Sequence, residues 1–226
     1  MKKLKRTGIA IFAMVAVFAV YVEMANRNTA NMTYRQKILK AIYPAFIWWT
    51  NLTGVNTKKL LHDPITPAVP LYGLKIISTD GKSFDLASFA GRKILLVNTA
   101  SDCGYTDQYE ALEKLYKQYT GKLEVIAFPS NDFKEQEKGS NTDISQFCKI
   151  NFGTSFPIMA KSGVKKGPGQ SAVFQWLTDP AKNGWNEQEP TWNFSKYLVD
   201  EKGRLTGFFG PSVTPLSDAV INELNK

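Results

Sequence analysis

Two segments near the N-terminus, residues 8–22 and 33–53, are rich in apolar residues. The rest of the chain is long enough to form one domain. Residues 8–22 (GIAIFAMVAVFAVYV) form an uncharged run of 15 residues between a basic start, residues 2–6, and Glu23. This length is short for a bilayer span but sufficient for the apolar region of a signal peptide. Three interpretations stay open: an uncleaved membrane anchor, a signal peptide cleaved after Ala19, or a helix buried in the domain. For an anchor or a signal, the charge asymmetry places the rest of the chain on the extracytoplasmic side, such as the periplasm.

A second segment, residues 33–53, is amphipathic at first and then apolar around Trp48 and Trp49. Pro44 is expected to kink or interrupt a helix here. Basic residues followed by tryptophans are typical of a segment lying at a membrane interface, and a helix packed on the domain is the alternative. Residues 54–70 contain three prolines and are interpreted as a linker. We therefore expect three parts: a signal peptide or membrane anchor (1–26), an amphipathic segment with a linker (27–69), and one domain (70–226).

The remainder alternates between strand and helix patterns. The expected strands are 71–79 and 83–86 around an Asp80-Gly81 turn, then 93–99, 123–128, 196–199 and 205–209; the expected helices are 106–120, 142–150, 170–178 and 216–224. The run 93–99 (KILLVNT) is apolar enough for a strand buried on both faces. This order is typical of a thioredoxin-like α/β fold, with a central mixed sheet flanked by helices.

Charge and composition limit the partners and the kinds of site that we expect. Residues 1–40 hold eight basic residues and one acidic residue, whereas residues 41–226 hold 20 and 19. The domain is therefore nearly neutral, and we expect no nucleic-acid partner. The sequence has one histidine, His62, and two cysteines, Cys103 and Cys148, which lie 45 residues apart. These counts exclude a CxxC pair, a four-cysteine zinc site and a histidine cluster, so we expect no metal and no cofactor.

Cys103 lies between the expected strand 93–99 and the helix that follows. Functional sites gather at the carboxyl ends of strands in α/β sheets. The partial positive charge at a helix N-terminus stabilises a thiolate, so this position favours a reactive cysteine. A buried structural cysteine is the alternative.

Several motifs surround Cys103 in a fixed order. They are 91–106 (GRKILLVNTASDCGYT), 128–133 (FPSNDF), 136–141 (QEKGSN), 147–148, 156–157 and 192–200 (WNFSKYLVD). Together they resemble the active-site signature of the glutathione peroxidase family, over roughly residues 70–226. The resemblance implies a thiol peroxidase that reduces hydrogen peroxide or organic hydroperoxides, lipid hydroperoxides included, and that protects against oxidative stress.

The same resemblance implies the roles of four residues. Cys103 is the peroxidatic residue, and Gln136, Trp192 and Asn193 complete the family's catalytic tetrad. Amide and indole N–H donors can hydrogen-bond a thiolate and the developing oxyanion, each contributing on the order of a few kcal/mol to catalysis. A histidine base is therefore not needed.

Attack on a peroxide converts the peroxidatic cysteine to a sulfenic acid, which a second thiol must reduce. Cys148 matches the resolving cysteine of the family's two-cysteine members, and a Cys103–Cys148 disulfide would be reduced by a thioredoxin-like protein. If Cys148 is buried, its helix must unfold locally to reach the geometry of a disulfide. A structural Cys148, with glutathione as the reductant, is the alternative.

Three departures from the family pattern lie near these residues. Ser130 replaces a common cysteine, and Asp132 stands where the family usually has glutamine. The carboxylate would raise the pKa of Cys103 if the two side chains approach. Charged residues also flank Gln136, at Lys134, Glu135 and Lys138. Asp132 and the altered loop around Gln136 keep open a different class of function, a non-catalytic thioredoxin-like module that senses redox state or binds a partner.

The stretch 158–191 is short and lacks the insertion of the family's tetrameric members. We therefore expect a monomer. A membrane anchor would suit the reduction of lipid hydroperoxides.

Overall fold

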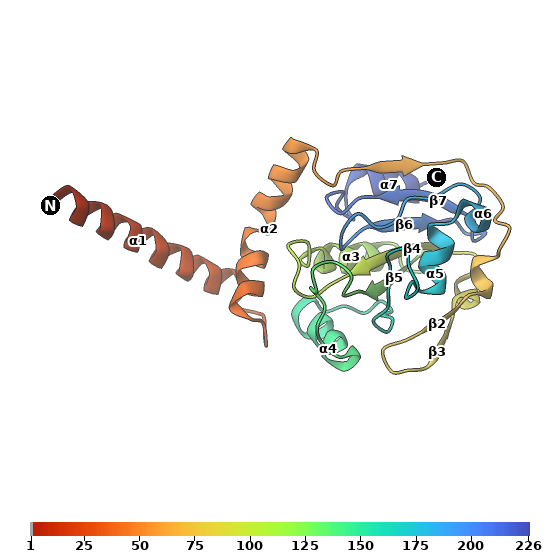
Figure 1. Cartoon of the computed structure of the whole chain (residues 1–226), viewed down its shortest axis with the longest axis horizontal. Coiled ribbons are helices and arrows are strands. Elements are labelled where there is room, and N and C mark those ends of the chain that lie inside the picture. The colour runs from red at the N-terminus through yellow and green to blue at the C-terminus, as the bar shows by residue number, and fades with distance from the viewer. Residues whose placement is uncertain (1) are drawn as a thin grey trace.

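Five strands form the central sheet, in the order β1-β7-β6-β4-β5 (Figure 1). The computed structural model describes residues 2–226, and their side chains from residue 7 onward. The strands are β1 (Lys59–Leu61), β4 (Lys93–Thr99), β5 (Leu123–Pro129), β6 (Lys196–Val199) and β7 (Leu205–Phe209). β4 and β5 pair in parallel and the other neighbours pair antiparallel, so the sheet is mixed, as expected.

Helices cover both faces of this sheet and complete a thioredoxin-like α/β fold (Figure 1). The helices of the domain are α3 (Gln108–Gln118), α4 (Asn141–Phe152), α5 (Ala172–Leu177), α6 (Pro180–Asn183), α7 (Asp218–Leu224) and two short 3-10 turns, η1 (Leu71–Gly73) and η2 (Leu86–Phe89). A separate hairpin contains β2 (Lys75–Ile77) and β3 (Ser83–Asp85). The Asp80-Gly81 turn joins these two strands, in agreement with the sequence analysis.

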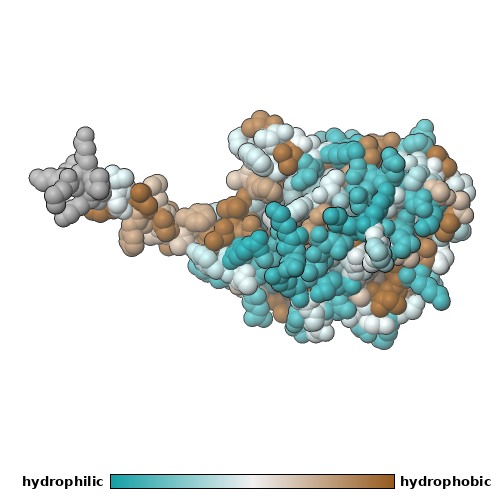
Figure 2. All heavy atoms as spheres, in the orientation of Figure 1, coloured by the Kyte–Doolittle hydropathy of each residue, from teal (hydrophilic) through white to brown (hydrophobic). Residues whose placement is uncertain are grey.

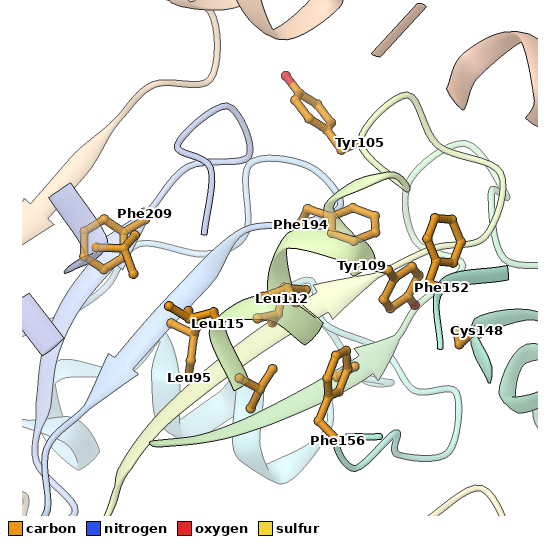
Figure 3. Close-up of a cluster of buried hydrophobic side chains, with 14 of the residues drawn as sticks. Leu95, Tyr105, Tyr109, Leu112, Leu115, Cys148, Phe152, Phe156, Phe194 and Phe209 are labelled. Atoms are coloured by element: carbon orange, nitrogen blue, oxygen red, sulfur yellow. The ribbon is translucent and has the colours of Figure 1, made fainter. Parts of the chain in front are cut away.

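The alternating side chains of β4 enter two hydrophobic cores. Leu95 and Val97 belong to the core that includes α3, α4 and α7, part of which Figure 3 shows. Ile94 and Leu96 belong to the opposite core, under α5. Because both faces of β4 are covered, the strand is apolar along most of its length.

In the N-terminal part, the expected linker over residues 54–70 and the expected interruption of a helix at Pro44 were wrong. Within the expected linker 54–70, Lys59–Leu61 form β1 and pair with β7 at the edge of the main sheet. Three residues are too few for a period of two to be recognised in a sequence. Pro44 does not interrupt α2 (Tyr34–Thr53), because the helix is held by a capping box at Thr33, a left-handed Gly54 cap and tertiary contacts along one side.

The first helix, α1 (Lys2–Ala25), projects away from the domain (Figures 1 and 2). Residues 7–25 form a stretch of 19 residues that is long and apolar enough to cross a membrane. The stretch is almost wholly exposed, which contradicts the interpretation of a helix buried in the domain. A signal sequence or a membrane anchor therefore remains.

Candidate functional site

Cys103 lies in the turn that connects β4 to α3. Thr106 fixes this turn: its hydroxyl accepts a hydrogen bond from the Cys103 N–H at 3.0 Å and donates to the Ala100 carbonyl at 2.8 Å. Only 1% of Cys103 is exposed. The turn therefore holds the thiol in a fixed, buried position at the carboxyl end of a central strand.

Hydrogen-bond donors from two segments, the cysteine loop and residues 192–193, face the sulfur. The Tyr105 N–H donates to Cys103 Sγ at 3.5 Å. The side chains of Trp192 and Asn193 lie near enough to act as donors that lower the pKa of the thiol. Asn193 Nδ2 donates to Gln136 Oε1 at 3.0 Å. The structure thus brings together the four residues that the sequence analysis singled out.

Asn98, to which the sequence analysis gave no role, positions the segment of Trp192 and Asn193. Its amide nitrogen donates to the Trp192 carbonyl at 3.1 Å, and its oxygen accepts from the Ser195 N–H at 3.0 Å. The intervening Phe194 adopts a φ of 67°, a strained conformation that the surrounding contacts must impose. The sequence did contain one sign of this role, because Asn98 is a polar residue inside the largely apolar run KILLVNT.

The loop carrying Gln136 is attached to the cysteine loop. The Asp102 N–H donates to the Gln136 carbonyl at 3.0 Å. Lys134 and Glu135, which precede Gln136, both have a φ of 51°. Two consecutive left-handed residues turn the chain sharply, and Gln136 follows that turn.

Burial dominates the electrostatics of Cys103. It raises the pKa of the thiol to about 11, although the bonds from Tyr105, Trp192 and Asn193 act to lower it. The thiol is therefore protonated at neutral pH in this conformation, contrary to the expected stabilisation of a thiolate. α3 begins only at Gln108, so its N-terminus is farther along the chain than the sequence pattern indicated.

Asp132 is bonded to a backbone segment and is not among the groups that shift the pKa of Cys103. Its carboxylate accepts hydrogen bonds from the N–H groups of Val164, at 2.6 Å, and Lys165, at 3.0 Å. The carboxylate that acts to raise the pKa of Cys103 belongs to Asp102. Asp102 in turn forms an ion pair with Arg35 of α2.

Cys148 points from α4 into a hydrophobic core (Figure 3). Its side chain is fully buried beside Tyr109, and burial raises the pKa of its thiol to about 12. Both cysteines are free thiols. Cys103 belongs to the same core, so both thiols are shielded from an external reductant in this conformation.

Glu137 is a buried carboxyl group that the sequence analysis did not single out. Its side chain accepts a hydrogen bond from the Ser101 hydroxyl at 3.1 Å. Burial raises its pKa to about 7, and its charge acts to raise the pKa of Cys148. The residue thus lies within electrostatic range of Cys148 and changes charge near neutral pH.

A cavity of about 420 Å³ opens beside Gln136, between residues 30–36, the cysteine loop and α4. Its wall combines apolar side chains of α4, such as Ile144 and Phe147, with the carboxylates of Asp102 and Glu135. In the part of the chain that the structure describes, no cluster of three or more His, Cys, Asp or Glu residues could hold a metal ion. The chemistry available here is that of a thiol and N–H donors.

Comparison with known proteins gives a consistent result. Residues 71–178 match the family model described as glutathione peroxidase. The chain is 37% identical over 159 residues to a glutathione peroxidase homolog, BsaA, of Bacillus subtilis, covering 69% of this chain and 99% of that protein. It is 42% identical over 147 residues to the glutathione peroxidase-like peroxiredoxin GPX5 of Chlamydomonas reinhardtii, covering 65% and 90%. The crystal structure of Trgpx in apo form is similar with a TM-score of 0.53 at 29% identity, covering 70% of this chain and 97% of that one.

Proposed function

The chain belongs to the glutathione peroxidase family and is a thiol peroxidase, and from this premise we propose which residues carry the reaction and which compounds it uses. The substrate is a peroxide and the reductant a thiol. We propose that Cys103 is the peroxidatic residue and that Gln136, Trp192 and Asn193 assist it. The observation that carries this assignment is the convergence of N–H donors on the Cys103 sulfur.

In the proposed first step the Cys103 thiolate attacks the terminal oxygen of hydrogen peroxide or an organic hydroperoxide. The S–O bond forms as the O–O bond breaks. The leaving oxygen takes up the proton that the thiol has released, which yields water or an alcohol and a sulfenic acid. Trp192 and Asn193 donate toward the developing negative charge, while Gln136 holds the Asn193 amide. Because burial keeps the resting thiol protonated, the thiolate must form as water or substrate enters the site.

In the proposed second step the Cys148 thiolate attacks the sulfenic sulfur. Hydroxide leaves and takes up the Cys148 proton as water, and a Cys103–Cys148 disulfide forms. A thioredoxin-like dithiol then reduces this disulfide. The deep burial of Cys148 means that part of α4 must open first, at a cost in free energy.

We further propose that α1 is an uncleaved anchor that holds a monomeric domain on the extracytoplasmic face of a membrane. The length and exposure of residues 7–25 support an anchor. Lipid hydroperoxides would then be substrates within reach. α2, packed on the cysteine loop, joins this anchor to the domain.

The alternative of a non-catalytic sensing module rested on Asp132 and on the altered loop around Gln136. Asp132 bonds to the backbone of Val164 and Lys165, and Gln136 remains bonded to Asn193. Neither departure therefore favours the alternative. A second-order rate constant for the oxidation of Cys103 separates the two, since a sensing module needs only an ordinary thiol.

Two serine substitutions test the assignment. Cys103→Ser removes the attacking sulfur, so peroxide consumption should fall to the uncatalysed background; retained turnover would contradict the proposal. Cys148→Ser should leave the first oxidation of Cys103 at the wild-type rate and abolish turnover driven by thioredoxin. Equal steady-state turnover with thioredoxin in this variant would rule out a resolving role, and glutathione in parallel assays identifies the preferred reductant.

A further inference from the structure

The inner face of α2 covers the cysteine loop. Gln36 Nε2 donates to the Ser101 carbonyl at 3.1 Å. The Phe46 ring lies 4.9 Å from the Tyr105 ring, centroid to centroid, and a Cβ added to Gly104 would lie 3.5 Å from it. The position of α2 is thereby fixed relative to Cys103.

The outer face of the same helix is apolar and exposed. Its stripe, which we call the outer stripe, contains Ile42, Ala45, Trp48, Trp49 and Leu52. Trp48 is 67% exposed and Leu52 is 70% exposed. No charged residue occurs between Lys40 and Lys58. An exposed apolar face of this extent is typical of a surface that contacts a partner or a lipid phase.

The end of α1 is bonded to α2. The Tyr21 hydroxyl donates to the Ala41 carbonyl at 2.9 Å, and Asn26 Nδ2 donates to the Lys37 carbonyl at 3.0 Å. Lys37 also pairs with Glu23 at 2.8 Å. These bonds fix the direction in which α1 leaves α2.

The arrangement of the two helices indicates what covers the outer stripe. α1 projects away from the sheet, and α2 runs crosswise between the end of α1 and the domain (Figure 1). If residues 7–25 cross a bilayer, the surface of that bilayer would therefore lie beside α2, on the side of α2 that faces away from the sheet. Tryptophan and leucine side chains are suited to the boundary between headgroups and acyl chains.

We propose that the outer stripe of α2 inserts into the surface of the membrane that α1 crosses, so that α2 holds the Cys103 loop at a fixed distance from the lipid. This inference rests on the proposed anchor and extends it, because the docked helix also sets the orientation of the active site. α2 and α1 precede the residues matched by the family model, which begin at residue 71.

The docking is tested with the full chain reconstituted in phosphatidylcholine vesicles whose acyl chains are brominated near the headgroup. Bromine quenches tryptophan emission on contact. The fraction of tryptophan emission quenched by the bromolipid should therefore be larger in the wild type than in a Trp48→Phe/Trp49→Phe variant. Trp185→Phe is the matched control, because Trp185 belongs to the domain, where its Nε1 donates to the Leu205 carbonyl at 2.8 Å, and its replacement should leave the quenching unchanged. Equal quenching in the wild type and the double variant would overturn the proposal. The proposal would also be overturned if Trp48 and Trp49 were shielded from quenching to a degree that depends on protein concentration and not on the bromolipid. That result would indicate that a second copy of the chain covers the outer stripe.

Activity measurements separate the failure of the docking from the failure of the proposed function. In vesicles, Trp48→Glu/Leu52→Glu should lower turnover of phosphatidylcholine hydroperoxide several-fold and leave turnover of dissolved hydrogen peroxide unchanged. Ile77→Glu, an exposed apolar position on the β2–β3 hairpin, is the matched control and should change neither rate. If the wild type consumes no peroxide, the proposed function fails while the quenching result still decides the docking. If the double glutamate variant keeps the wild-type rate on the vesicle-borne hydroperoxide, the proposed orientation of the active site is wrong.

Discussion

Glu137 shows how one buried side chain links stability to pH near neutrality. Burial raises its pKa from the ordinary 4.5 to about 7. Between these two values the folded protein binds more protons at this position than the unfolded chain. Stability therefore falls as the pH rises through this window.

Glu137→Gln should remove that decline while keeping an oxygen that accepts the Ser101 hydrogen bond. Between pH 4.5 and 7 the wild type should lose on the order of 3 kcal/mol through this group, because each pKa unit corresponds to about 1.4 kcal/mol. Urea unfolding at the two ends of the window measures the difference. Glu135→Gln, an exposed neighbour, is the control and should retain the wild-type pH dependence. An unchanged pH dependence in Glu137→Gln would mean that Glu137 is ionised throughout the window in the folded protein.

At the scale of elements, α2 covers the loop that carries the reactive thiol. The helix lies against Gly104 and Tyr105. These two residues stand between Cys103 and Thr106 in the chain. Desolvation is the largest cause of the raised pKa of Cys103. We therefore expect α2, which lies outside the residues matched by the family model, to contribute to this desolvation.

Phe46→Ala should admit water to the cysteine loop and lower the pKa of Cys103 from about 11 by on the order of one unit. In a Cys148→Ser background, where Cys103 is the remaining cysteine of the sequence, iodoacetamide alkylates Cys103. The pH dependence of the alkylation rate measures the pKa of Cys103. Trp48→Ala, on the outer face of the same helix, should leave it unchanged because Trp48 is 67% exposed. A pKa that does not move in Phe46→Ala would show that α2 does not control the hydration of the thiol.

At the scale of the whole molecule, the chain divides into an exposed apolar helix and a nearly neutral domain (Figure 2). The bonds from Tyr21 and Asn26 to α2 join the two parts. Cleavage after Ala19 would remove most of α1 but leave these contacts in place. The structure of the domain is therefore compatible with either fate of α1, and the proposed anchor needs its own test.

If α1 is retained, the protein isolated from membranes of an expressing bacterium should have the mass of the unprocessed chain. It should also resist extraction by alkaline carbonate, because residues 7–25 remain in the bilayer. A mature N-terminus at Val20 would instead identify a signal peptide. A double substitution Val15→Lys/Val17→Lys within α1 should release the full-length protein from the membrane, since charges in the middle of a span are costly.

The sequence by itself determined the strands β4, β6 and β7, the thioredoxin-like order of elements and the cysteine motif. These features depend on periodicity and spacing between residues that are close in the chain. The family signature further led to Gln136, Trp192 and Asn193, which the structure brings together with Cys103.

Only the tertiary structure decided how buried the two thiols are, where Asp132 points and that residues 59–61 complete the sheet. Each of these depends on segments far apart in the sequence: α2 covers the loop of Cys103, and Val164 and Lys165 bind the Asp132 carboxylate. A pKa depends on the water that a group loses and the dipoles it gains. The chain order does not contain that information, so the same cysteine that the motif identifies as reactive has a pKa that burial in the folded protein raises.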